Sequence, residues 1–269
     1  MLKSNLISML TAHSKEQISD LDYISFVFQQ LKKELYPTYL YSHGNCHNVS
    51  HLASMILTQC GIMHQKIWIF APCRLDPTRK ESIVFKIKND LAPRKIIRWG
   101  YHVGILVVLQ NESYVIDLFM DTDKPIRLAD WTHQLNASEH RVLVEPPQHY
   151  LYHSTPHPPR GKEIFNGTFF EYEGLCRDDK WLPKGLAINQ IAYEFLLNEC
   201  HKPTELSLDC QQLIKSIYTF DAFLGNHNKW HKVSTDFMAK YPLMAKKYQY
   251  QYQEALDHWL GVFNYWDVK

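Results

Sequence analysis

Three residues of types that cooperate in nucleophilic catalysis stand out in this sequence: Cys46, His102 and Asp117. A thiolate attacks a carbonyl carbon, an imidazole takes up and returns the proton, and a carboxylate holds the imidazole in one tautomer and orientation. The three residue types therefore predict a Cys46–His102–Asp117 triad for acyl-transfer chemistry, provided that the fold brings them together.

The segment after Asn45 has the apolar periodicity of a helix. Apolar residues recur there at three- and four-residue steps before Gly61 ends the pattern, and they are Val49, Leu52, Ala53 and Ile56. Cys46 is therefore expected in the first turn of this helix. The partial positive charge of a helix start favours a thiolate, and the unpaired backbone N–H groups there can stabilise an oxyanion.

The histidine and the aspartate lie in two β-rich segments, residues 95–109 and 114–118, which Asn111-Glu112-Ser113 separates. The pattern predicts a hairpin whose pairing brings residues near 105 and 117 together. Asp117 has apolar neighbours on both sides, so it needs a partner that offsets its burial. An imidazole on the paired strand meets that need.

Each of these residues also has a structural interpretation. A single cysteine at a helix start is commonly a small buried apolar residue, and a histidine in a strand is commonly a satisfied polar residue. His47 and His51 stand four residues apart beside Cys46, but the glutamate of an H-E-x-x-H zinc motif is absent at Asn48. We therefore expect no metal here, and the sequence contains no glycine-rich phosphate loop.

The elements around these residues indicate an α+β fold. Helices are expected near residues 6–10 and over 19–36, before the helix that begins at Cys46. Strands are expected at 66–70, 82–88, 95–109, 114–118 and 141–145, with a short helix over 128–135. The proline-containing stretch 148–184 is interpreted as irregular, and residues from 185 onward as helical, ending in a helix over 248–266. This order predicts a catalytic domain at 1–160 and a mostly helical region at 161–269 that can pack on the same core.

The composition narrows the class of partner. The chain has 269 residues with 45% hydrophobic residues, and 29 basic against 28 acidic side chains leave a net charge of +1. No overall field exists to attract nucleic acid or an anionic membrane, although a local basic patch is compatible with that total. Six cysteines in 269 residues are too few for a disulfide scaffold, and they include no C-x-x-C pair of a structural zinc site. Reduced thiols in a cytosol-like compartment are the simpler interpretation, although an even number of cysteines also permits disulfides.

Three sequence blocks resemble the protein-glutaminase family of protein-deamidating enzymes, over roughly residues 41–131. The blocks are Gly44-Asn45-Cys46-His47, Trp99-Gly100-Tyr101-His102-Val103, and Tyr114-Val115-Ile116-Asp117 with Asp123-Lys124-Pro125 and Trp131 downstream. The resemblance implies a papain- and transglutaminase-like α+β fold with the triad on Cys46, His102 and Asp117. Asn45, Trp99 and Tyr101 adjoin the triad in these blocks and are candidates for stabilising the oxyanion or positioning the substrate.

Two departures from the family pattern concern the substrate pocket. The family has a proline directly after the triad acid, where this sequence has Leu118, and small residues after the catalytic cysteine, where it has His47 and Asn48. The resemblance does not extend to the helical C-terminal third.

The expected function is deamidation of glutamine side chains in a protein substrate, without a metal or organic cofactor. A transglutaminase or a cysteine protease would use the same triad, because the acceptor and the bond attacked depend on pocket shape and water access. A non-catalytic binding module is the alternative of another class. A compact chain for which we expect no signal peptide would also suit a bacterial effector delivered into a host cell.

Overall fold

The computed structural model describes residues 20–41, 43–86, 96–109, 112–121, 123–136, 139–157, 162–200, 204–226 and 231–267. The helix expected near residues 6–10 lies outside the described residues. The first two α-helices of the described chain are α2 (Asp20–Glu34) and α3 (Cys46–Gln59), joined through a short 3-10 turn at Thr38–Leu40. Both helices occur where the apolar periodicity predicts them, and α3 begins at Cys46 itself.

A five-stranded antiparallel sheet forms the centre of the molecule, in the order β6-β5-β4-β1-β7. Its strands are β1 (Gln65–Phe70), β4 (Tyr101–Leu109), β5 (Glu112–Ile116), β6 (Ile126–Arg127) and β7 (Arg141–Glu145). Because β4 and β5 pair directly, the predicted hairpin is confirmed. The mixed α/β class with an antiparallel sheet is confirmed as well.

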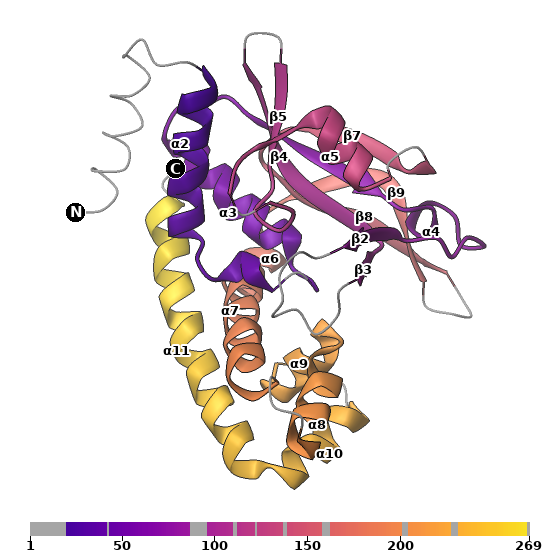
Figure 1. Cartoon of the computed structure of the whole chain (residues 1–269), viewed down its shortest axis with the longest axis vertical. Coiled ribbons are helices and arrows are strands. Elements are labelled where there is room, and N and C mark those ends of the chain that lie inside the picture. Colours follow the sequence, from indigo (N-terminus) through magenta and orange to yellow (C-terminus); the bar gives the residue numbers. More distant parts are fainter. Residues whose placement is uncertain are drawn as a thin grey trace.

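The two faces of the sheet are covered differently, as the alternation of side chains along β1 shows. Trp68 and Phe70 belong to the larger core, which includes α2, α3 and the C-terminal helices. Ile67 and Ile69 belong to a smaller core beneath α5 (Leu128–Gln134). Figure 1 shows the helices α2, α3, α7 and α11 gathered on one side of the sheet, away from α5.

The interpretation of residues 148–184 as irregular is wrong. They form a hairpin of β8 (His149–His157) and β9 (Lys162–Glu171), followed by α6 (Leu175–Asp178) and the start of α7 (Trp181–Glu199). The proline that breaks the sequence pattern, Pro156, is tolerated because β8 pairs with one neighbour only, and Pro183 lies in the first turn of α7, where its missing N–H costs nothing. Aromatic stacking of Phe70 on Phe165, with ring centroids 4.4 Å apart, fastens this hairpin to the sheet.

The C-terminal third is helical, with α8 (Glu205–Ile214), α9 (Ile217–Phe223), α10 (Lys232–Lys240) and α11 (Pro242–Trp266) after α7. The apolar pattern around residues 210–220 spans two helices, α8 and α9, which are separated by the extended backbone of Ser216. All these helices contribute to the core that also contains α2 and α3. The expected boundary at residue 160 falls within the β8–β9 hairpin, and the division into two domains stays a prediction.

Two small elements complete the surroundings of the site. A two-stranded ribbon consists of β2 (Ile83–Lys86) and β3 (Ile96–Trp99), and α4 (Pro72–Leu75) follows β1. Figure 1 shows the ribbon between the central sheet and α9. Among the described helices, none combines the length and the apolar character that crossing a bilayer requires.

Candidate active site

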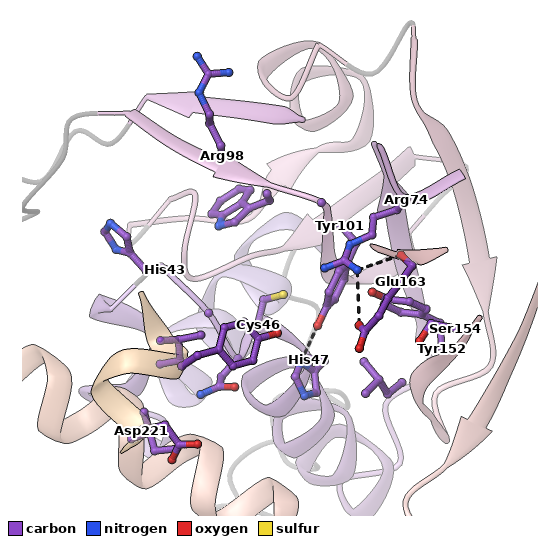
Figure 2. A pocket seen from close by; sticks show the side chains of 18 residues that line it. His43, Cys46, His47, Arg74, Arg98, Tyr101, Tyr152, Ser154, Glu163 and Asp221 are labelled. Carbon is purple, nitrogen blue, oxygen red and sulfur yellow. Dashed lines mark hydrogen bonds and ion pairs between the residues drawn. The ribbon is translucent and has the colours of Figure 1, made fainter. Parts of the chain in front are cut away.

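Cys46 is the first residue of α3, and the residue before it makes the turn into the helix. Asn45 has the left-handed conformation with φ of 60°, which asparagine adopts more readily than most residues. Cys46 is 8% exposed and lines a cleft, into which Figure 2 shows its side chain. The sulfur is therefore accessible at a helix start, where backbone N–H groups lack intrahelical acceptors.

The β4–β5 hairpin brings His102 and Asp117 into direct contact. Ile105 pairs with Ile116, so the aspartate follows the last residue of β5 and turns back toward β4. His102 Nε2 lies 2.7 Å from Asp117 Oδ2, and both side chains are buried. This contact leaves Nδ1 as the imidazole nitrogen that can serve a nucleophile.

Asp117 receives further hydrogen bonds that fix its carboxylate. The indole Nε1–H of Trp131 donates to Oδ2 at 2.7 Å, and the backbone N–H groups of Phe119 and Met120 donate to Oδ1 at 3.1 and 3.3 Å. The sequence blocks contained Trp131 but suggested no role for it. Its contact shows why a tryptophan follows the acid at this spacing, since the hairpin and α5 place the indole over the carboxylate.

Aromatic rings enclose the imidazole. Trp99 stacks on His102 with ring centroids 4.2 Å apart and an angle of 8° between the planes. Trp131 stacks at 6.3 Å, and Phe119 meets the ring edge-on at 5.9 Å. These contacts leave the His102 side chain fully buried, so its orientation is fixed by packing as well as by Asp117.

Two neighbours of His102, Asp117 and Cys46, raise its pKa and offset the effect of burial. Burial disfavours the imidazolium, but the negative charge and hydrogen bond of Asp117, together with the interaction with the adjoining Cys46, raise the pKa of His102 to about 10. Among the described residues, His102 Nδ1 is buried without a hydrogen-bond partner, so it is available to the adjoining Cys46. His102 is therefore positively charged at neutral pH, beside the sulfur.

The three residues predicted to position the substrate or the oxyanion all line the cleft. Tyr101 Oη lies 3.0 Å from His47 Nδ1, and Trp99 is the ring stacked on His102. The Asn45 side chain donates to the backbone carbonyl of Gly185 and to Asn189 Oδ1, at 3.1 and 3.2 Å. Its amide is therefore engaged by α7, and its clearest structural task is to hold the start of α3.

The histidines that follow Cys46 join a buried basic cluster. His51 Nδ1 lies 2.5 Å from the Nζ of Lys66, which also donates to the His149 carbonyl at 2.6 Å. Burial and the charge of Lys66 lower the pKa of His47 to about 3 and hold that of His51 well below its ordinary value. Within the described ranges, no group of three His, Cys, Asp or Glu residues is arranged to hold a metal ion.

The cleft beside Cys46 has a volume of about 460 Å³ and is built from segments far apart in the chain. One wall carries Arg74, whose guanidinium donates a hydrogen bond to the Glu163 carbonyl at 3.0 Å. The Arg74 side chain also passes close to Gly100, because a Cβ added to Gly100 would lie 2.5 Å from Arg74 Nε. The other walls come from β8 and α9 and include Leu151, Tyr152, Ser154, Ile217, Tyr218 and Asp221. Sequence reasoning missed these residues because only long-range packing brings them to Cys46.

A cysteine at a helix start beside a buried histidine–aspartate pair defines a candidate thiol-dependent acyl-transfer site. Residues 24–135, which include Cys46, His102 and Asp117, match the model of a family described as Glutaminase. This match confirms the resemblance to the protein-glutaminase family that the sequence blocks indicate, for the part of the chain that carries the site.

Solved structures similar to this chain include the protein-glutaminase of Chryseobacterium proteolyticum, determined by NMR. It is 17% identical, with a TM-score of 0.43, over 70% of this chain and 94% of that one. A crystal structure of a protein-glutaminase is 16% identical over the same shares, with a TM-score of 0.40. The A47Q2 mutant of a pro-protein-glutaminase is 14% identical over 73% of this chain and 66% of that one, with a TM-score of 0.45. A comparison with curated proteins finds no match.

Proposed function

We propose that this protein is a cysteine-dependent glutaminase that hydrolyses glutamine side-chain amides in protein substrates, with Cys46, His102 and Asp117 as its triad. The single observation that carries the proposal is the buried His102–Asp117 hydrogen bond of 2.7 Å beside a cysteine that opens into a cleft. The match of residues 24–135 to the glutaminase family supports the choice of a glutamine amide as the bond attacked.

In the first half of the reaction, the Cys46 thiolate attacks the carboxamide carbon of a glutamine that enters the cleft. A C–S bond forms while the carbonyl π electrons move to the oxygen. Backbone N–H groups at the start of α3 stabilise this oxyanion, and Tyr101 and Trp99 border the same space. When the oxyanion collapses, the C–N bond breaks and the His102 imidazolium protonates the leaving nitrogen, which departs as ammonia.

In the second half, the neutral imidazole takes a proton from water as the water oxygen attacks the thioester carbon. The C–S bond breaks, Cys46 returns to the thiolate, and the side chain leaves as glutamate. Asp117 accepts the imidazole hydrogen bond throughout and stabilises the charged form of His102. The sum is glutamine plus water to glutamate plus ammonia, with no cofactor required.

The proposal extends to the fold family and the setting. A helix that begins with the nucleophile and packs on an antiparallel strand bearing the histidine supports a papain- or transglutaminase-like core. All six cysteines are free thiols, as a thiolate enzyme in a reducing, cytosol-like compartment requires. Action as an effector on a host protein is part of the same proposal.

The activity is tested by incubating the protein with glutamine-containing peptides while ammonia release and product mass are followed. We expect ammonia and an intact peptide in which one amide has become an acid. Peptide fragments would instead identify a protease, and adducts with an added primary amine would identify a transglutaminase. The Cys46→Ala variant must release no ammonia; if it retains the biological effect of the protein, a binding module replaces the enzyme.

Thiol labelling separates chemical activation from mere exposure. Cys60 and Cys73 are more exposed than Cys46, which is only 8% exposed. If His102 activates the sulfur, iodoacetamide at mildly acidic pH labels Cys46 before these two cysteines. Labelling in the order of exposure would contradict the proposed thiolate, and Cys73→Ala serves as the control that leaves labelling of Cys46 unchanged.

A further inference from the structure

The β2–β3 ribbon presents a distinctive outer face at the edge of the cleft. Its inward residues, which are Ile83, Phe85, Ile97 and Trp99, are buried in the smaller core. The alternate residues are exposed and pair across the strands, Val84 opposite Arg98 and Lys86 opposite Ile96. Two cations are thus interleaved with two aliphatic side chains on one solvent-facing surface, which we call the ribbon face.

The two cations of the ribbon face have no ion-pair partner within the described ranges of the chain. Neither Lys86 nor Arg98 has a carboxylate partner among the residues that the structure describes, whereas Arg74 across the cleft is paired with Glu163 at 3.5 Å. In the sequence, residues 83–99 contain five basic residues and one acidic residue, namely Lys86, Lys88, Arg94, Lys95 and Arg98 against Asp90. This short segment carries a net charge of +4 within a chain whose total is +1.

The ribbon face is continuous with the candidate active site. Arg98 and Trp99 line the same cleft as Cys46, and the Trp99 ring stacks directly on His102. Figure 2 shows Arg98 on the ribbon that borders the cleft, on the opposite side from α9 and Asp221. A substrate whose glutamine reaches Cys46 would therefore extend neighbouring residues along this ribbon.

We propose that the ribbon face docks a segment of the protein substrate in which acidic and aliphatic side chains alternate near the target glutamine. Lys86 and Arg98 would pair with the carboxylates, while Val84 and Ile96 would contact the aliphatic groups. The inference rests on the proposed deamidation, because it names the substrate that this activity selects. A protein segment fits better than nucleic acid, since half of the exposed side chains on this face are aliphatic and none is aromatic.

The inference is tested with three peptides of equal length that contain one glutamine each. In each peptide, a block of alternating residues flanks the glutamine on both sides. The block alternates leucine with glutamate in the first peptide, leucine with serine in the second, and leucine with lysine in the third. We expect kcat/KM for ammonia release to be highest for the glutamate peptide, by about three- to tenfold over the serine peptide. The advantage should shrink as salt is raised from about 0.05 to 0.5 M.

Charge reversal locates the preference on the ribbon face. In the Lys86→Glu/Arg98→Glu variant, the ratio of kcat/KM for the glutamate peptide to kcat/KM for the serine peptide should fall to about one or below. The matched control is Lys33→Glu/Lys246→Glu, which makes the same change of charge at two exposed lysines on α2 and α11. This control should retain the glutamate preference.

The possible failures are distinguishable. If no peptide releases ammonia, the proposed function itself fails. If ammonia is released equally from all three peptides, or if the glutamate preference survives in the ribbon variant, the deamidase remains and the docking inference is overturned. Binding of a single-stranded oligonucleotide to the wild-type protein that is lost in the ribbon variant, without any peptide preference, would also overturn it in favour of nucleic acid.

Discussion

At the scale of single residues, the site depends on how firmly the charged form of His102 is held. Asp117 accepts its Nε2–H, and Trp99 and Trp131 cover its faces. Because the pKa of His102 is raised to about 10, the imidazolium persists through neutral pH and is lost as the pH rises through that value. In the proposed deamidation, which uses this proton for the leaving ammonia, activity should therefore decline only at strongly alkaline pH.

Asp117→Asn should lower kcat/KM by at least about 100-fold and move the alkaline decline toward neutral pH, because it removes the negative charge that favours the imidazolium. A pH profile of kcat/KM checks both effects. Asp123→Asn, which changes an exposed carboxylate in the following loop, should leave the profile in place. An unchanged alkaline limb in Asp117→Asn would show that another group sets it.

The Trp131→Phe variant should lower activity because the Asp117 carboxylate loses a hydrogen bond, and not because packing is lost. Phenylalanine keeps an apolar ring in this buried position but removes the N–H that donates to Asp117 Oδ2 at 2.7 Å. We expect kcat to fall by about 10- to 150-fold, since loss of a hydrogen bond to a charged group costs about 1.5–3 kcal/mol. Steady-state kinetics well below the melting temperature check this; unchanged kcat with a lowered melting temperature would assign Trp131 a structural role only.

At the scale of elements, the site depends on the close approach of α7 to the start of α3. A Cβ at Gly185 would lie 1.8 Å from Asn48 Nδ2, and the buried Asn48 is held by a hydrogen bond from Tyr150. Gly185 also accepts the hydrogen bond from the Asn45 side chain. The glycine therefore allows a helix of the C-terminal third to fix the turn that presents Cys46.

Gly185→Ala should destabilise the protein by about 2 kcal/mol, since overpacking outweighs the gain in helix propensity, and it should also reduce activity. Gly261→Ala is the matched control in α11, because a Cβ there meets no atom within 4 Å. The control should stabilise the protein by about 0.5–1 kcal/mol. Denaturant unfolding of both variants checks the pair, and equal effects would contradict the role of the α3–α7 contact.

The elements that could be predicted from sequence are those specified locally. The α3 start at Cys46 follows from periodicity and the residues before it, and the short β4–β5 connection made the contact of His102 with Asp117 foreseeable to within one residue of register. The β8–β9 hairpin was missed because its prolines resemble those of a loop. The cleft walls at Tyr152 and Tyr218 depend on packing between distant segments, for which a single sequence carries no periodic signal.

At the scale of the whole molecule, the buried basic cluster makes stability depend on pH. The pKa of His47 is lowered from 6.5 to about 3, and that of His51 lies well below 6.5, so the folded state binds fewer protons than the unfolded state in acid. Stability is therefore lost as the pH falls below about 6.5. The slope should approach about 1.4 kcal/mol per pH unit for each of these histidines.

His47→Gln tests this at one site, because glutamine can still accept a hydrogen bond from Tyr101 but does not titrate. The loss of unfolding free energy between about pH 6.5 and 4.5 should be smaller in the variant by up to about 2 kcal/mol. At pH values above 7.5 the two proteins should show parallel pH dependence, which serves as the internal control. Identical acid slopes would mean that His47 takes up its proton in the folded state.

The stacking of Trp99 on His102, with ring centroids 4.2 Å apart, makes Trp99 an intrinsic fluorescence probe of the site. A positive imidazolium against an indole face perturbs the excited state of that indole, whereas a neutral imidazole does so far less. Alkylating Cys46 removes the interaction with the sulfur that helps to raise the pKa of His102. The intrinsic fluorescence of the unlabelled enzyme should therefore change when Cys46 is alkylated or acylated, and stopped-flow emission could follow formation and hydrolysis of the thioester without a chromogenic substrate.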